Sequence, residues 1–600
     1  MVLPRRDEVP REVRWDVESI FPTDEAWEAA YRAVAGRLGE LDEYRGRLGE
    51  SAATLLAGLR RRDELAKELG LVAVYARLRR AEDATNATYA ALADRAAGLQ
   101  ARFAAAAAFY DPEILALDPA TLDRYVEAEP GLAVYRHSFA KLGVMRGHIR
   151  SPEVEETLAE ARDVTGVFAA IRGALENADL DLGTIADEEG RPVRLRAGNL
   201  QRFQRSADRA VRRAAWETSA DAYLGLQHTF AGTLIGTVKR DAFYARARRF
   251  GSSLEAALAP HAIPVEVFHN LVDTVWKNLP VWHRYFALRR RILGYDTLHG
   301  WDLTAPLERN PPAIPFERGV ELIARGLAPL GADYVAIVRQ GAAERWVDRA
   351  ANVGKGGGAF SSGAPGTHPF VSMTYQDTLQ SVSTLAHELG HSLHSYHTWR
   401  AQPPVYARYS MFVAETASNM HQALLGAHLL ETVSDPDFLV TVIEERMGNH
   451  LRYLFTMPIL AKFELDCHER VERGEALTAE GMTATLAELY RQGYGGEVAF
   501  DAPRMGITWA RFGHLFSNFY VFQYATGIAA AAALARQARE EGAPAARRYV
   551  DFLSTGDAAF PLDALRAAGV DMRDPAPVQA AFDILAGYVE RLERVLSGER

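Results

Sequence analysis

The sequence has almost no cysteine, since Cys467 is the only one among 600 residues. One thiol cannot pair within the chain, which excludes a disulfide scaffold and predicts a buried structural thiol. Long apolar runs are also absent: residues 525–535 are mostly alanine and fall short of the ~20 residues that span a bilayer. The N-terminus, MVLPRRDEVPREVRW, is charged and lacks the apolar segment of a secretory signal. These absences predict a soluble, cytoplasmic protein with no membrane partner.

An excess of positive charge is missing as well. The chain has 68 Lys and Arg against 78 Asp and Glu, a net charge of −10. Because such a surface repels phosphate backbones, and no local basic patch stands out, we expect no nucleic-acid partner. The hydrophobic share of 48% and the charged share of 24% are ordinary for a globular chain and argue against disorder.

Helical periodicity and good helix formers dominate what is present. The pattern predicts successive helices over 24–48, 51–70 and 72–110, separated by glycine or by polar junctions. Further along, it predicts helices over Gln380–Tyr396 and Met411–Leu430.

The sequence pattern changes from helical periodicity to alternation near residues 180–200. There, DLGTIADEEGRPVRLR alternates on both sides of Glu-Glu-Gly, which predicts a β-hairpin. Helical periodicity resumes at Asn199. We therefore expect an N-terminal helical domain over 1–195 and a larger helical domain over 196–600.

The strongest chemical signal is His387-Glu388-Leu389-Gly390-His391, an HExxH pattern. Positions i and i+4 share one helix face, so both imidazoles can reach one metal ion. Glu388 lies beside that face, where a carboxylate can take a proton from water. Gly390 costs ~1 kcal/mol inside a helix relative to alanine, which suggests that another segment packs close to it.

A catalytic zinc ion needs three protein ligands and an open position, and two residues compete to be the third ligand. His397 stands ten residues after His387, as in HExxHxxGxxH, but that pattern needs glycine at position 394, where this chain has histidine. Glu415 is the other candidate, 24 residues after His391 on the next expected helix. Its neighbours are apolar, which favours a buried carboxylate.

HELGHSLHSYH, followed at this distance by AETAS, resembles the thimet-type zinc oligopeptidases of family M3, and most of all their oligoendopeptidase F branch. The resemblance extends upstream through GGAFSSGAPGTHPFVSMTYQDTLQSVSTLAHELGH and downstream to TWARFGHLFSNFYVFQYATGIAAA. The N-terminal half is similar only in being helical and in its WDVESIF opening.

This resemblance implies one zinc ion held by His387, His391 and Glu415, with Glu388 as general base. It implies a mostly α-helical, two-lobed fold around a deep central channel that admits short peptides and excludes folded proteins. His394 matches a further histidine of the family motif that is not a metal ligand there.

The oxyanion of a tetrahedral intermediate needs a hydrogen-bond donor besides the metal. The family places a histidine and tyrosines opposite the zinc, in the segment that matches HLFSNFYVFQYATG. The resemblance therefore implies His514 and Tyr520 as donors, with Tyr524 as a further candidate. An aromatic helix face packed in the core is the alternative for each of them.

Residues 351–370 contain six glycines, too many for a helix or a plain strand. We expect the glycines at 354–358 and 363–366 to form a mobile flap over a cleft, with a surface loop as the alternative. Phe370–Tyr375 follows as an expected edge strand beside the HExxH helix, able to pair with extended substrate backbone.

The sequence thus predicts a zinc-dependent endopeptidase that hydrolyses internal bonds of short oligopeptides. A helical HExxH zinc carboxypeptidase is one alternative, and it would need a fixed cation to bind the terminal carboxylate. A non-catalytic peptide-binding helical protein is the other. A site with two nitrogen ligands and one oxygen ligand also accepts Mn²⁺ or Co²⁺. Cleavage preference and oligomeric state do not follow from the sequence.

Overall fold

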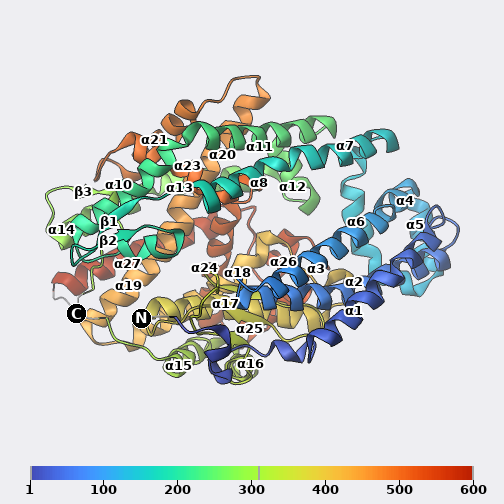
Figure 1. The fold of residues 1–600 in the computed structure, drawn as a ribbon, viewed down its shortest axis with the longest axis horizontal. Coiled ribbons are helices and arrows are strands. Elements are labelled where there is room, and N and C mark those ends of the chain that lie inside the picture. Colours follow the sequence, from blue (N-terminus) through green and yellow to red (C-terminus); the bar gives the residue numbers. More distant parts are fainter. Residues whose placement is uncertain (1–2, 309–310, 598–600) are drawn as a thin grey trace. The chain divides into compact units, whose positions relative to one another are not determined.

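The computed structural model describes residues 3–308 and 311–597 (Figure 1). Helices make up most of this part of the chain and its strands are short, which confirms the prediction of a mostly α-helical fold. None of the described helices is both long enough and apolar enough to cross a bilayer. The chain divides into two compact units, Met1–Arg146, Ala313–His428 and Leu534–Val570 in the first, and Gly147–Pro312, Leu429–Ala533 and Asp571–Arg600 in the second.

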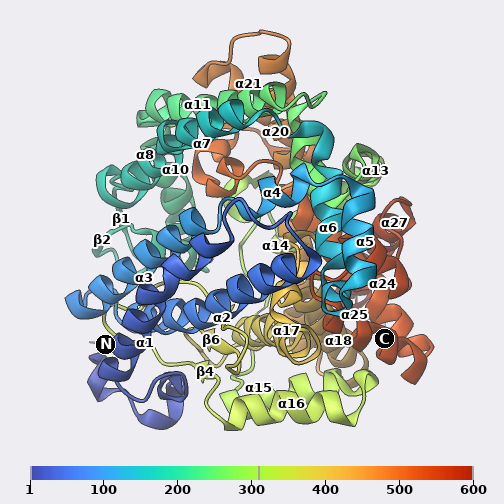
Figure 2. The same cartoon turned by 90° about the vertical axis from the view of Figure 1, so that its right-hand side faces the viewer.

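The first unit holds the N-terminal helices and the segment around the HExxH pattern. Its helices are α1 (Asp24–Arg37), α2 (Ala52–Glu82), α3 (Ala87–Ala106), α4 (Tyr110–Ala116), α5 (Pro119–Ala128), α6 (Arg136–Val144), α15 (Phe316–Gly326), α16 (Ala332–Ala343), α17 (Leu379–Ala401), α18 (Met411–Thr432, assigned here up to His428), α25 (Ala543–Thr555) and α26 (Pro561–Ala567). In Figures 1 and 2, α2 and α3 lie side by side.

Helix α2 corrects the expected helix boundaries. It runs unbroken through Gly70, where the sequence pattern predicted a junction, because the flanking side chains Leu69 and Val72 are buried in the core of this unit. The chain breaks after Glu82 instead. There the Asn86 side chain accepts hydrogen bonds from the first N–H groups of α3 and so begins a new helix. The single helix predicted over 72–110 is therefore wrong.

A three-stranded sheet lies in the same unit, with strand order β4–β6–β5. β4 (Val347–Asp348) pairs in parallel with β6 (Phe370–Ser372), and β5 (Phe360–Ser362) pairs with β6 antiparallel. The prediction of an edge strand at Phe370–Tyr375 is wrong: β6 is the central strand, and all three of its residues are buried. The strand with an open edge beside α17 is β5, inside the glycine-rich segment.

Helices α17 and α18 lie close to their predicted positions. The Thr378 side chain accepts a hydrogen bond from the Ser381 N–H and begins α17. A loop that contains Pro403 and Pro404 separates the two helices. The Ser410 hydroxyl then accepts a hydrogen bond from the Phe412 N–H at the start of α18.

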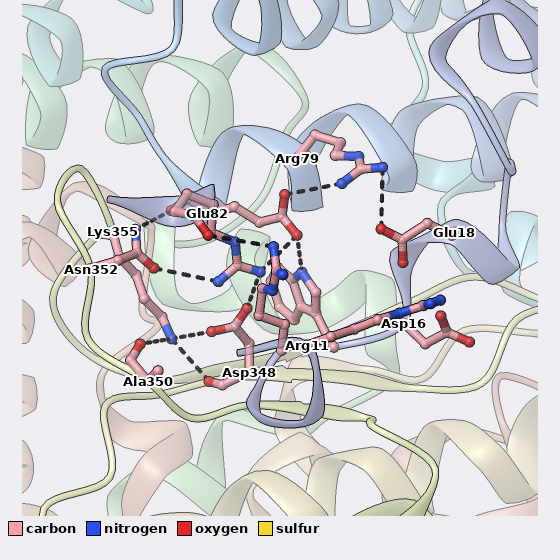
Figure 3. A network of polar contacts seen from close by, with 12 residues as sticks. Arg11, Asp16, Glu18, Arg79, Glu82, Asp348, Ala350, Asn352 and Lys355 are labelled. Atoms are coloured by element: carbon pink, nitrogen blue, oxygen red, sulfur yellow. Dashed lines mark hydrogen bonds and ion pairs between the residues drawn. The ribbon is translucent and has the colours of Figure 1, made fainter. Parts of the chain in front are cut away.

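A buried network of charges fastens the N-terminal segment and the glycine-rich loop to the sheet (Figure 3). The Arg6 guanidinium pairs with Glu82 at the end of α2 and with Asp348 on β4. The Lys355 ammonium donates hydrogen bonds to Asp348 and to the carbonyl oxygens of Ala350 and Met373, at 2.8 and 2.7 Å for the two carbonyls. Because each buried charge has partners, the network orders the loop that leads into β5.

The second unit contains the predicted hairpin, in which β1 (Thr184–Ala186) and β2 (Pro192–Arg194) pair antiparallel. A two-stranded parallel sheet is formed by β3 (Leu298–His299) and β7 (Val498–Ala499). Its helices are α7 (Pro152–Thr165), α8 (Val167–Ala174), α9 (Ala197–Gln204), α10 (Arg209–Gly225), α11 (Gln227–Ala247), α12 (Ser253–Leu258), α13 (Val265–Lys277), α14 (Leu279–Leu293), α19 (Pro436–His450), α20 (Met457–Glu472), α21 (Ala479–Tyr494), α22 (Ala502–Gly506), α23 (Thr508–Arg511), α24 (Phe522–Glu540, assigned here up to Ala533) and α27 (Ala576–Ser597). The Cys467 thiol, on α20, is buried as predicted.

Candidate metal centre

His387 and His391 on α17 and Glu415 on α18 converge in the first unit. The Oε2 atom of Glu415 lies 3.4 Å from Nε2 of His387 and 3.8 Å from Nε2 of His391. One potential ligand atom from each residue lies within 4.8 Å of the other two, and no other group of His, Cys, Asp or Glu in the described residues meets this criterion. Two imidazole nitrogens and one carboxylate oxygen form a donor set that suits zinc and related first-row ions.

Gly390 allows the two helices to come this close. A Cβ atom built at this position would lie 2.5 Å from the carbonyl oxygen of Ala417 and 2.6 Å from Cα of Ser418, both in the backbone of α18. No side chain larger than hydrogen fits there without movement of a helix. The expectation that another segment packs against Gly390 is therefore confirmed.

His387 is oriented through the second nitrogen of its ring. Nδ1 of His387 is hydrogen-bonded to Oε1 of Gln422 at 3.0 Å, while the Gln422 amide nitrogen donates to the Ser383 hydroxyl. The backbone of Ala414 acts on His391 in the direction that raises the pKa of its imidazole. Such outer partners fix the orientation of a metal-binding imidazole and raise its basicity.

Gln422 is a residue that our sequence analysis missed. It stands seven residues after Glu415, which is two helical turns further along the same face of α18. That spacing is the signal that was available. Glu415 itself accepts a hydrogen bond of 2.9 Å from the Ser418 hydroxyl, one turn away.

Burial sets the protonation of the centre. It lowers the pKa of His391 to about 4, so this imidazole is neutral at pH 7 and its nitrogen can bind an ion. Burial also raises the pKa of Glu388 to about 7, and the negative charge of Glu415 adds to that rise. His387 and a hydrogen bond from the Ser361 backbone act in the opposite direction.

Glu388 has one carboxylate oxygen, Oε2, that is buried and has no hydrogen-bond partner among the described residues. A buried acceptor without a donor is costly, which suits a position where a water molecule or a substrate completes the site. The three converging ligand atoms, with this unsatisfied oxygen beside them, therefore fit a metal centre that leaves room for a further ligand.

The remaining histidines of α17 lie outside this group. His394 is buried and stacks on Tyr409 with ring centroids 3.6 Å apart. His397, the alternative third ligand, stacks on Tyr334 with a centroid distance of 5.7 Å. Burial lowers the pKa of both imidazoles.

His514, Tyr520 and Tyr524 gather in the second unit, where His514 lies in a short 3₁₀ helix and Tyr524 in the first turn of α24. The three rings have pairwise centroid distances of 5.3 to 5.5 Å. The two tyrosine hydroxyls are hydrogen-bonded at 3.0 Å. Tyr524 also stacks on Tyr453. They form one polar aromatic cluster, and their role at the metal centre stays a prediction.

Most of the sequence matches known families. The family model described as Peptidase family M3 matches residues 202–584, and the one described as Oligopeptidase F matches residues 113–181. The chain is 38% identical over 595 residues to oligopeptidase PepF of Bacillus subtilis (strain 168), covering 99% of this chain and 89% of that protein. It is 33% identical over 592 residues to group B oligopeptidase PepB of Streptococcus agalactiae serotype III (strain NEM316), covering 99% and 98%. Among solved structures, oligoendopeptidase-F from Enterococcus faecium matches with a TM-score of 0.76 and 30% identity over 96% of this chain and 100% of that chain.

Proposed function

This chain belongs to peptidase family M3, and we propose the role of each site residue in peptide hydrolysis. It is a metallo-endopeptidase that hydrolyses oligopeptides at internal bonds. We assign zinc as the ion, with His387, His391 and Glu415 as its ligands. The observation that carries this assignment is the convergence of these three side chains from two helices. A zinc ion held there supplies Lewis-acid polarisation of the peptide carbonyl and lowers the pKa of water.

Glu388 is the general base and then the general acid. Its raised pKa, near 7, lets the carboxylate accept a proton from the attacking water and give it back to the leaving amine at neutral pH. The buried, unpaired Oε2 atom is the position that accepts this proton. The Ser361 backbone acts in the opposite direction to burial and favours the charged carboxylate.

The substrate backbone binds along the open edge of β5. An extended peptide can add to that edge through main-chain hydrogen bonds, a mode that tolerates many side chains. Ser361 lies in the middle of β5, and its hydroxyl is 2.9 Å from the Ser392 hydroxyl on α17. A peptide on this edge therefore lies beside Glu388.

His514 and Tyr520 are the proposed oxyanion donors, and Tyr524 is a further candidate. Each offers an N–H or O–H group, and the Tyr520–Tyr524 hydroxyl pair holds the two phenols in defined positions. Tyr520→Phe removes one such donor, so we expect kcat to fall about 10²-fold with little change in KM. An unchanged kcat would assign this hydroxyl to packing alone.

Metal analysis and turnover of matched variants test the assignment. We expect Glu388→Gln to retain one equivalent of zinc but to lose at least about 10³-fold in kcat on an internally quenched peptide blocked at both ends, because it removes the base. We expect Glu415→Ala to lose both the turnover and the zinc, because it removes a ligand. Glu415→Ala protein that retains stoichiometric zinc, or Glu388→Gln protein with full turnover, would refute the assignment.

A further inference from the structure

A cavity of about 550 Å³ lies along β5 in the first unit. Its walls come from the last turns of α2, from the glycine-rich loop and from β5 itself. The lining includes Arg77 and Arg80 on α2, the glycines at 356–358, and Phe360, Ser361 and Ser362 on β5. Two lining residues are arginines and none is acidic, although the chain as a whole carries a net charge of −10.

The two arginines have no carboxylate partner in the described part of the chain. Arg77 and Arg80 are both exposed and stand three residues apart on α2, so their side chains lie on one face of the helix. The guanidinium of Arg77 donates a hydrogen bond of 2.7 Å to the Ser362 hydroxyl. Burial lowers the pKa of Arg77, and the positive charge of Arg408 lowers it further.

This cavity adjoins the catalytic centre through one residue. Ser361 lines the cavity, and its hydroxyl lies 2.9 Å from the hydroxyl of Ser392 on α17, which donates a hydrogen bond to the backbone carbonyl of Glu388. Ser362, the next residue of β5, carries the hydroxyl that binds Arg77. Because a strand advances ~3.3 Å per residue, a peptide paired with β5 brings residues close to the scissile bond within reach of these cations.

We propose that Arg77 and Arg80 bind a carboxylate of the peptide substrate and so determine which oligopeptides are cleaved fastest. This inference rests on the proposed function, in which β5 receives the substrate. The carboxylate is either an Asp or Glu side chain near the scissile bond or the C-terminus of a short peptide, since both present the same two oxygens to a guanidinium. Exposed Phe360 supplies an apolar contact for the neighbouring part of the chain.

Substrate pairs that differ by one charge separate these two sources. In the first arm, internally quenched peptides blocked at both ends carry a single Glu or Gln at each of three positions on either side of the scissile bond. In the second arm, the neutral peptide ends in either an acid or an amide. We expect kcat/KM to be about fivefold or more higher for the charged member of at least one pair. The arm in which that pair lies identifies the source.

Variants of Arg77 and Arg80 test whether these two residues cause the preference for the charged peptide. Arg77→Gln combined with Arg80→Gln is expected to bring the charged-to-neutral ratio close to one, and Arg80→Glu to invert it. Raising salt from about 0.05 to 0.5 M should reduce the wild-type ratio, because exposed charges are screened. Arg102→Glu is the matched control: it places the same charge change on an exposed position of α3, away from the cavity, and should keep both the ratio and the basal activity.

A binding measurement keeps this inference separate from catalysis. In Glu388→Gln protein, fluorescence anisotropy should give a Kd about fivefold lower for the preferred charged peptide than for its neutral partner. Equal Kd values, wild-type ratios near one in both arms, or a preference that survives the double Gln variant would each overturn the proposal. Failure of the wild type to cleave any peptide would instead refute the proposed function, and the Kd ratio would still decide the role of the arginines.

Discussion

Among single residues, Lys355 shows what a buried charge does for this fold. Its ammonium group donates hydrogen bonds to Asp348 and to the carbonyl oxygen of Ala350 (Figure 3), and also to the carbonyl oxygen of Met373. Asp348 is completely buried. Lys355→Met keeps the length of the side chain but removes every one of these donors. Because it leaves a buried carboxylate short of a partner, we expect the free energy of unfolding to fall by about 3–5 kcal/mol.

Urea denaturation of the two proteins measures this loss. The exposed pair of Arg32 with Glu28 provides the control, since Arg32→Ala there should change the free energy of unfolding by less than about 1 kcal/mol. If Lys355→Met is as stable as the wild type, the network of Figure 3 does not hold the glycine-rich loop in place.

At the scale of elements, the contact between α17 and α18 decides whether the three proposed ligands can meet. Gly390→Ala would place a methyl group 2.5 Å from the Ala417 carbonyl oxygen and so push the two helices apart. Overpacking of this kind costs about 1–3 kcal/mol, which outweighs the ~1 kcal/mol gained from helix propensity. We expect lower stability together with zinc affinity reduced at least about tenfold, measured by competition with a chromophoric chelator.

Gly232→Ala is the matched control for that experiment. Gly232 lies inside α11 with no atom near the position of its missing Cβ. The substitution there should raise the free energy of unfolding by about 0.5–1 kcal/mol and leave the zinc affinity unchanged. Equal behaviour of the two alanine variants would contradict a special contact at Gly390.

The segment that carries His514 and Tyr520 is held by Glu464 on α20. Its Oε1 atom accepts a hydrogen bond of 2.7 Å from the backbone N–H of Phe519, whose φ is 48°. Burial raises the pKa of the Glu464 carboxyl well above its usual value, and the negative charge of nearby Asp241 raises it further. The imidazole of His468 lies 3.6 Å from Asp241.

This shift predicts a pH dependence of stability. Because the pKa is higher in the folded than in the unfolded state, folding favours the protonated carboxyl, and its contribution is fully present below the unfolded value of about 4.3. This stabilising contribution is lost as the pH rises from the unfolded pKa through the higher folded pKa. Glu464→Gln stays neutral at every pH and so does not suffer this loss. The melting temperature of the variant minus that of the wild type should therefore be at least about 2 °C larger at pH 8 than at pH 4.5. A constant difference across this range would show that Glu464 does not titrate differently on folding.

At the scale of the whole molecule, an ion that binds only the folded state must stabilise it. Zinc at about 1,000 times its Kd adds about 4 kcal/mol to the free energy of unfolding. We therefore expect a strong chelator to lower the melting temperature of the wild type by about 3–6 °C, and added zinc to restore it. Glu415→Ala should melt at the same temperature with and without the chelator. If the chelator left the melting temperature of the wild type unchanged, this would contradict the binding of a zinc ion by this centre.

The sequence by itself determined the features that depend on local periodicity. A helix of 3.6 residues per turn places His387 and His391 on one face wherever the helix lies, and the apolar neighbours of Glu415 predicted a buried carboxylate. The same periodicity predicted α17 and α18, and local alternation predicted the hairpin of β1 and β2. These features need no information about distant segments.

Only the tertiary structure decided which distant segments meet. The strand order β4–β6–β5 made Phe370–Ser372 central and left Phe360–Ser362 at the edge, because hydrogen bonds between strands depend on pairing and not on local pattern. Core packing carried α2 through Gly70. The contact of Arg77 with Ser362 joins residues 285 positions apart, so it cannot be predicted from any local spacing in the sequence. Such contacts depend on the free energy of packing the whole unit, which no short window of sequence contains.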